Sequence, residues 1–233
     1  MARLHAERMR DLLRSIAGGE VRPGDKLPRE VDLASRLGVS RAVVRSAIQG
    51  LVDRDVVSVK HGSGQTVRPP MEWDVLDVDV LEAVVRFGDA RDLLLEVLEA
   101  RLLLEVPAVG LAAERAGTAD VAALREHAET MLRTARSRRS PDGEDAYAHA
   151  ESLLHRRIGL ATGNRPLARS LAPLQYATQV AGVGDSRRRQ TAGERRELVD
   201  SIERRDVTAA RSAAQRHLEA LLVAARRPPR RRR

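Results

Sequence analysis

The first 70 residues contain three stretches in which apolar side chains recur at helical spacing. Residues 4–16 predict an amphipathic helix that ends at Gly18, and residues 28–37 predict a second helix. Ser40 is a favourable N-cap for a third helix. On this third helix the apolar and polar positions fall on different faces: Val43, Val44, Ala47, Ile48 and Leu51 on one, and Arg41, Arg45 and Gln49 on the other. The polar face is therefore available to a polar partner.

A β-hairpin and a boundary follow the third helix. Residues 56–59 and 66–67 have the pattern of two strands around the turn His61-Gly62-Ser63-Gly64. Pro69-Pro70 then interrupts the pattern, and beyond it the repeat of Leu, Ala and Val predicts helices. The expected helices lie at about 81–87, 91–116, 119–138, 143–162, 166–181, 190–204 and 207–225, with a bend or break at Pro107.

These elements divide the chain of 233 residues into four segments. We expect a winged helix-turn-helix domain of three helices and a β-hairpin wing over 1–68, and a linker over 69–80. An all-α helical bundle over 81–225 and a disordered Arg-rich tail over 226–233 follow. The fold class is therefore mainly α. Aromatic residues make up only 2% of the chain, so the cores must consist of Leu, Val, Ala and Ile, which suits the packing of helix against helix.

The composition excludes several kinds of site. The chain has no cysteine, which rules out a disulfide framework, thiolate zinc ligands and a cysteine nucleophile. Nothing at the start of the sequence has the pattern of a secretory signal, and no segment approaches the roughly 20 apolar residues of a membrane span. We therefore expect a cytoplasmic protein with no membrane partner.

The net charge of +8 is unevenly distributed along the chain. The first 70 residues carry 13 basic and 8 acidic side chains, and residues 226–233 add six arginines and no acid, so the middle of the chain is mildly acidic. This distribution indicates that a polyanion would bind to the N-terminal domain. We expect the terminal arginines to be solvated, with a nonspecific contribution to DNA affinity as the alternative.

Two short helices joined through Leu37-Gly38-Val39 predict a helix-turn-helix, in which the second helix enters the DNA major groove. Arg41 and Arg45 occupy the part of that helix that faces base edges, and arginine binds guanine O6 and N7 in a bidentate fork. Phosphate contacts that fix the register are expected from Ser40, Arg29 and Lys60.

Residues 1–68 resemble the winged helix-turn-helix of the GntR superfamily of bacterial regulators. The residues that carry the resemblance are Leu27-Pro28-x-Glu30, Leu33-Ala34, Leu37-Gly38-Val39-Ser40-Arg41, Val44-Arg45, Ala47 and Gly62-x-Gly64. It implies a homodimer on a palindromic double-stranded DNA operator, usually as a repressor.

The resemblance also implies which side chains contact the operator. The positions that match are Ser40, Arg41, Ala42 and Arg45 on the recognition helix and Lys60, His61 and Gly62 at the wing. Lys60-His61-Gly62 is similar to the FadR branch, where the wing tip enters the minor groove. Val31 departs from the pattern, because relatives have a DNA-contacting arginine there, and Arg29 is its candidate substitute.

The rest of the chain resembles the ligand-binding helical domain, of the FCD type, found in FadR-type regulators. Residues 73–81 are similar to a linker in members that respond to sugar acids. The matching segments further on are Arg101-x-x-x-Glu105, 111–116, Leu154-His155, Thr162-Gly163-Asn164 and 194–206. This implies that a small anionic metabolite, such as a sugar acid or another carboxylate, modulates operator binding.

Many such domains hold their effector through a divalent metal bound by an Asp and three histidines. Glu151 and His155 share a helix face and His217 matches a further ligand, so a zinc, nickel or manganese site is one interpretation. Arg195, however, stands where relatives have His, and a permanent cation would repel a metal.

Two further interpretations of this set of residues remain. In one, Arg195 and Arg101 clamp the anionic effector directly, beside His155 and His217. In the other, these are ordinary structural side chains. Asn164 is ambiguous in the same way, because it can hydrogen-bond an effector or cap the helix that follows.

Two other functions compete with that of a ligand-responsive regulator. A nonspecific architectural DNA-binding protein would explain the basic ends but leaves the long helical domain unexplained. A helical metalloenzyme would use Glu151 and His155, but the chain has no H-E-x-x-H motif, Gly-rich phosphate loop or nucleophile motif. We therefore expect no enzymatic activity.

Overall fold

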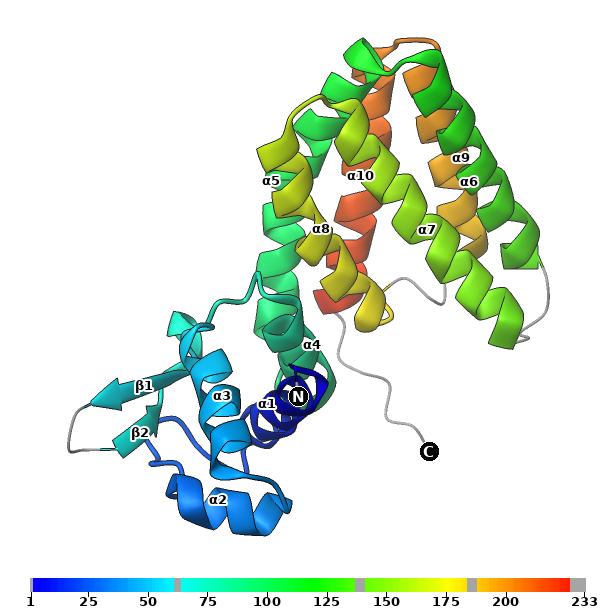
Figure 1. Cartoon of the computed structure of the whole chain (residues 1–233). Helices are drawn as coiled ribbons and strands as arrows, with labels where there is room; N and C mark the ends of the chain where they lie inside the picture. Colours follow the sequence, from blue (N-terminus) through cyan, green and yellow to red (C-terminus); the bar gives the residue numbers. More distant parts are fainter. Residues whose placement is uncertain (1, 61–63, 137–140, 184–187, 227–233) are drawn as a thin grey trace, which may run out of the picture. The chain divides into compact units, whose positions relative to one another are not determined.

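The computed structural model describes residues 2–60, 64–136, 141–183 and 188–226 (Figure 1). The chain forms two compact units, Met1–Ala90 and Arg91–Arg233. Helices dominate both units, which confirms the mainly α class. The wing tip at 61–63 and residues 227–233 of the expected disordered tail lie outside the described residues.

The first unit contains three helices, an antiparallel hairpin and a fourth helix (Figure 1). Val57 pairs with Val67 and Lys60 with Gly64, so the two strands form an antiparallel hairpin. The elements are α1 (Ala2–Ala17), α2 (Glu30–Leu37), α3 (Arg41–Val52), β1 (Val57–Lys60), β2 (Gly64–Val67), a 3-10 turn at Pro70–Glu72 and α4 (Val78–Phe87).

The expected cap and the two faces of α3 are present. Ser40 accepts a hydrogen bond from the backbone N–H of Val43 at 3.4 Å, which satisfies one of the free donors at the helix start. The apolar face packs into a core with α1 and β1, where Leu13, Val44 and Leu51 are fully buried. Burying that face leaves the opposite face of α3 at the surface.

Helix α2 begins at Glu30 rather than at Pro28 as expected. The residues before it pair with β2. The backbone N–H of Leu27 donates to the Gln65 carbonyl at 2.9 Å, and Lys26 forms an antiparallel β-bridge with Thr66. These pairs hold the chain extended up to Leu27. Residues 26 and 27 therefore form a third strand-like segment beside the hairpin.

Residues 69–80, expected to be a linker, are attached to the first unit. The indole N–H of Trp73 donates to the Arg68 carbonyl at 2.9 Å, and the ring lies in the same core as α1 and α3. Asp77 caps α4, and Arg54 donates to it at 2.9 Å and to Asp79 at 3.2 Å. Helix α4 packs on α1, so residues 81–87, expected in the helical bundle, belong to the first unit.

The second unit consists of helices packed side by side (Figure 1). Helix α5 packs on α10 and α8, α7 on α6 and α8, and α9 on α6 and α10. Small and aliphatic side chains fill the core. The helices are α5 (Arg91–Arg115), α6 (Thr118–Arg136), α7 (Pro141–Ala161), α8 (Arg165–Val180), α9 (Arg188–Glu203) and α10 (Val207–Arg226).

Pro107 does not break α5. Proline lacks an N–H, so the carbonyl four residues earlier, that of Leu103, loses its helical partner. Leu103 and Pro107 both lie on the exposed face of the helix, and 76% of Leu103 is accessible. Water can satisfy the carbonyl there. None of the described helices is long and apolar enough to cross a membrane.

The cap at Asp77 gives a test of how firmly α4 belongs to the first unit. We expect Asp77→Ala to lower the free energy of unfolding of this unit by ~1–2 kcal/mol, because it removes the cap of α4 and the partner of Arg54. Trp73 is the only tryptophan of the chain, so its fluorescence during urea unfolding reports on this unit. Asp77→Asn keeps a capping oxygen and should lose less of the free energy of unfolding. If Asp77→Ala were as stable as the wild type, the assignment of α4 to the first unit would be contradicted.

Candidate functional site

The exposed face of α3 carries the residues expected to read DNA. Arg41, Ala42 and Arg45 are all exposed there. Arg29, directly before α2, and Lys60, at the end of β1, are also exposed, as phosphate contacts must be. His61 and Gly62 lie outside the described residues.

Glu30 is a partner of Arg45 that the sequence reasoning did not identify. Arg45 Nη2 lies 3.0 Å from Glu30 Oε2, and Arg45 Nε lies 3.3 Å from the same oxygen. Since Glu30 begins α2, this pair orients the arginine from the neighbouring helix. The signal was available, because Glu30 belongs to the Leu-Pro-x-Glu motif, but the motif does not tell which side chain it contacts.

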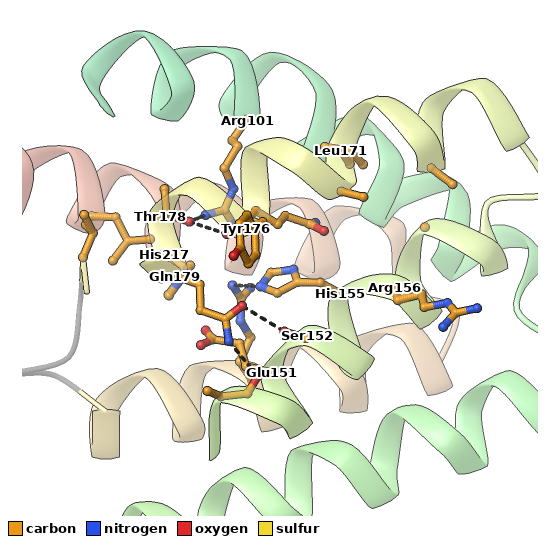
Figure 2. A pocket seen from close by; sticks show the side chains of 18 of the residues that line it. Arg101, Glu151, Ser152, His155, Arg156, Leu171, Tyr176, Thr178, Gln179 and His217 are labelled. Carbon is orange, nitrogen blue, oxygen red and sulfur yellow. Dashed lines mark hydrogen bonds between the residues drawn. The ribbon is translucent and has the colours of Figure 1, made fainter. Parts of the chain in front are cut away.

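The second unit contains a pocket of about 730 Å³ between α5, α7, α8, α9 and α10 (Figure 2). Four of the five residues expected to bind an effector line it, namely Arg101, His155, Arg195 and His217. The fifth does not: Asn164 accepts a hydrogen bond from the Leu167 N–H at 3.1 Å and caps α8.

Arg101 and Glu105 form a buried ion pair one turn apart on α5. Arg101 Nε donates to Glu105 Oε2 at 2.9 Å, and Arg101 Nη1 donates to the hydroxyl of Thr178 at 2.7 Å (Figure 2). Both charged side chains are at most 2% exposed. The Thr178 hydroxyl donates a hydrogen bond to the Gln175 carbonyl at 2.9 Å, so its oxygen is left to accept from Arg101. The guanidinium is therefore fixed in direction.

Arg195 enters the same cluster from α9 and determines the protonation of His155. Arg195 Nη2 lies 3.0 Å from His155 Nε2. A guanidinium only donates hydrogen bonds, so Nε2 must accept and the ring proton must sit on Nδ1. That nitrogen faces Glu105 Oε1 at 3.4 Å. His155 is thus a neutral imidazole that accepts from Arg195 and lies beside Glu105, without a hydrogen bond to it in the described part of the chain.

Burial and neighbouring charge agree with this state. Burial, and then the charge of Arg195, lower the pKa of His155 well below its usual range. Burial also acts to raise the pKa of Glu105, but the charges of Arg101 and Arg195 outweigh it and hold this pKa well below its usual range. Glu105 is therefore ionised between two guanidiniums.

The cluster has more positive than negative charge. Arg101 and Arg195 are both buried, and Glu105 is the buried acid between them, with Arg195 Nη1 3.8 Å from Glu105 Oε1. Arg195 Nε is buried without a hydrogen-bond partner among the described residues. A buried donor and an unbalanced buried cation both favour an anionic ligand.

His217 faces the pocket from α10 and is also neutral. Its Nδ1 lies 2.7 Å from Glu194 Oε2. Burial, and next the charge of Arg195, lower the pKa of His217 to about 4, although Glu194 acts in the opposite direction.

The residues present do not fit a divalent metal. Arg195 occupies the lone pair of His155 Nε2, which a metal would need. Glu151 lines the pocket from α7, but the described residues include no group of three or more His, Asp or Glu side chains able to hold an ion. The metal site that was one interpretation of Glu151, His155 and His217 therefore has no support from this arrangement.

The two units match two known sequence families. Residues 6–67 match the family "Bacterial regulatory proteins, gntR family", and residues 96–220 match the FCD domain. The chain belongs to the GntR family of bacterial regulators, with an FCD domain as its second unit. The resemblance read from the sequence is thereby confirmed.

Similar GntR-family proteins have been described. The galactonate operon transcriptional repressor of Escherichia coli is 28% identical over 206 residues, which cover 86% of this chain and 87% of that protein. A putative L-lactate dehydrogenase operon regulatory protein of the same species is 28% identical over 223 residues, which cover 91% and 81%. These relatives are regulators of transcription rather than enzymes.

Solved structures show the same fold. Lar, described as controlling the agr system of Listeria monocytogenes, aligns with a TM-score of 0.64 and 19% identity over 94% of this chain and 95% of that one. A GntR protein from Streptococcus agalactiae aligns with a TM-score of 0.54 and 21% identity, covering 94% and 99%. The chain is thus a GntR-family transcriptional regulator with a DNA-binding unit and a ligand-binding FCD unit.

The neutral histidines predict an acid-sensitive FCD domain. An unfolded histidine has a pKa near 6.5, so below that pH the unfolded chain takes up protons that folded His217 and His155 refuse. The free energy of unfolding should therefore fall as the pH drops from about 6.5 towards 4. His217 alone should cost on the order of 2 kcal/mol at pH 5.

Thermal melts followed by circular dichroism at pH 7 and pH 5 measure this effect. His217→Gln should show a smaller drop than the wild type, whereas His149→Gln, at an exposed position of α7, should keep the wild-type drop. An unchanged drop in His217→Gln would mean that His217 is not held neutral.

Proposed function

We propose that this GntR-family protein is a homodimeric repressor that binds a palindromic operator and releases it when a small carboxylate binds in the FCD pocket. The observation that carries the proposal is the buried cluster of Arg101, Glu105 and Arg195, which presents an unbalanced positive charge to a pocket. The relatives named for galactonate and lactate dehydrogenase operons support the same class of ligand, a hydroxy or sugar acid.

The pocket offers a carboxylate both positive charge and hydrogen-bond donors of fixed orientation. Thr178 and Glu105 fix the guanidinium of Arg101, and Arg195 has a buried Nε–H with no partner among the described residues. A carboxylate that lies between the two guanidiniums would accept several charge-assisted hydrogen bonds. It would also balance the extra charge.

In this proposal Arg195 takes the part of the metal found in related domains. Its charge lies beside His155 Nε2, where a metal would be bound, and it is permanent. The effector would therefore bind without any ion. His155 would hold Arg195 in place, and neutral His217, with its Nδ1 on Glu194, would keep Nε2 to accept a hydrogen bond from a hydroxyl group of the effector.

For the operator, the proposal assigns hydrogen bonds with bases to Arg41 and Arg45. Ala42, whose side chain is a methyl group, would make a van der Waals contact with the DNA. Ser40, Arg29 and Lys60 would hold phosphates, and His61 and Gly62 would form the wing contact. A single recognition helix reads few base pairs, so a dimer with two half-sites about one helical turn apart is required for specificity. Glu30 would present Arg45 to the groove.

The route from pocket to operator follows the chain. Helix α5, which carries Arg101 and Glu105, is separated from α4 by only three residues, Gly88 to Ala90. Arg54, directly after α3, holds the start of α4 through Asp77. A shift of α4 would therefore move α3 with it as one body, and effector binding would change the spacing of two recognition helices in a dimer.

A selection of genomic fragments at physiological salt, followed by footprinting, tests the operator assignment. We expect a short palindrome, and a loss of roughly 1–3 kcal/mol of base discrimination for Arg41→Ala and for Arg45→Ala. Arg86→Ala on α4 serves as the matched control and should bind like the wild type. Binding without sequence preference, or binding insensitive to both α3 variants, would favour an architectural DNA-binding protein instead.

Arg195→His tests whether the arginine has replaced a metal. The variant places an imidazole beside His155 and His217, so it should retain about one equivalent of zinc per chain after dialysis, measured by atomic emission. The wild type should retain none. Arg196→His, the same change at the next position of α9, should also retain none. Zinc retained by the wild type would contradict the proposal that Arg195 has replaced a metal.

A further inference from the structure

Three more arginines line the same pocket, away from the buried cluster. Arg156 lies on α7, and Arg165 and Arg169 lie on α8. All three are exposed, whereas Arg101 and Arg195 are buried. Within the described part of the chain none of the three side chains forms a hydrogen bond or ion pair, although the chain contains 33 Asp and Glu residues that could have paired with them. We call these three residues the rim arginines.

The rim arginines are gathered where α7 and α8 cross. The two helices approach closely there, since a Cβ added to Gly159 would lie 3.2 Å from the Cβ of Ala168. Arg156 lies one turn before Gly159, and the other two rim arginines lie three residues before and one residue after Ala168. The three positions therefore lie close to this approach of α7 and α8, on the lining of the pocket.

The pocket has separate places for two charged groups. Figure 2 shows the guanidinium of Arg156 on the side of His155 away from Arg101 and Thr178. Apolar side chains such as Leu160 and Leu171 line the space as well. A volume of about 730 Å³ suits a ligand of several functional groups better than a single small carboxylate.

We propose that the effector is a phosphorylated carboxylic acid, such as a sugar acid phosphate, whose carboxylate binds Arg101 and Arg195 while its phosphate binds the rim arginines. This inference rests on the proposed function, because it assumes the carboxylate site. A phosphate has three terminal oxygens, and guanidinium forks bind it bidentately, so three arginines suit it better than they suit a second carboxylate. The exposed rim leaves the phosphate partly hydrated, which lowers the cost of its desolvation.

Matched pairs of acids with and without a phosphate test the inference by isothermal titration calorimetry on the full chain. The probes are 6-phosphogluconate with gluconate, and 3-phosphoglycerate with glycerate. We expect the phosphorylated acid to bind about tenfold more tightly than its partner in at least one pair. The gain should shrink at high salt, because the rim arginines are exposed.

The double variant Arg165→Gln/Arg169→Gln should remove this gain and leave the affinity for the unphosphorylated acid within about twofold. Both positions are exposed, so the fold should persist. Arg204→Gln/Arg216→Gln removes the same charge from exposed positions outside the pocket and should leave both affinities unchanged.

Each other outcome overturns a definite statement. Equal binding of the two acids of a pair, or equal weakening of both by Arg165→Gln/Arg169→Gln, would overturn the phosphate site and leave the carboxylate site standing. Binding of neither acid in either pair would overturn the anionic pocket and with it the proposed function.

Discussion

The buried ion pair of Arg101 and Glu105 is the interaction on which the functional part of the structure depends. Both side chains lie inside the helical unit, where a lone charge is prohibitively costly, so each requires the other. Removing one partner of such a pair typically costs about 3–5 kcal/mol, because the remaining charge stays buried. Thr178 accepts a further hydrogen bond from Arg101, and His155 Nδ1 lies 3.4 Å from Glu105 Oε1. Arg195 then adds a second buried cation, whereas Glu151 and Glu194, the other acids near it, are only partly buried, and this imbalance among the buried charges is what makes the site suited to an anion.

The same helix connects this cluster with the DNA-binding unit along the chain. Helix α5 follows α4 directly, and α4 is fixed to the end of α3 by Arg54 and to the core by Val80. The connection between α4 and α5 therefore consists of Gly88 to Ala90 rather than of a long linker. In the proposed mechanism, a displacement at the start of α5 would act on the recognition helix through these residues and α4.

The positions of the helices could be predicted from the sequence, but the elements and side chains that they contact could not. The cap at Ser40 and the two faces of α3 follow from local rules, and they were predicted. The start of α2 depends on the pairing of the preceding residues with β2, and the place of α4 in the first unit depends on its contacts with α1. No local sequence pattern encodes either. The matched motifs contained Glu30 and Glu105, and only their contacts with Arg45, Arg101 and His155 gave those residues a role. That the charge of Arg195 would repel a metal stays a prediction from the sequence.

The central claim is that buried arginines, and not a metal, hold the effector. Its most direct test is calorimetric titration of the full chain with a panel of sugar acids and hydroxy acids, before and after the protein has passed over a chelating resin. The account predicts that at least one carboxylate binds, and that its affinity stays within about twofold after chelation. If chelation abolishes binding and added zinc, nickel or manganese restores it, the pocket works through a metal and the role given to Arg195 is wrong.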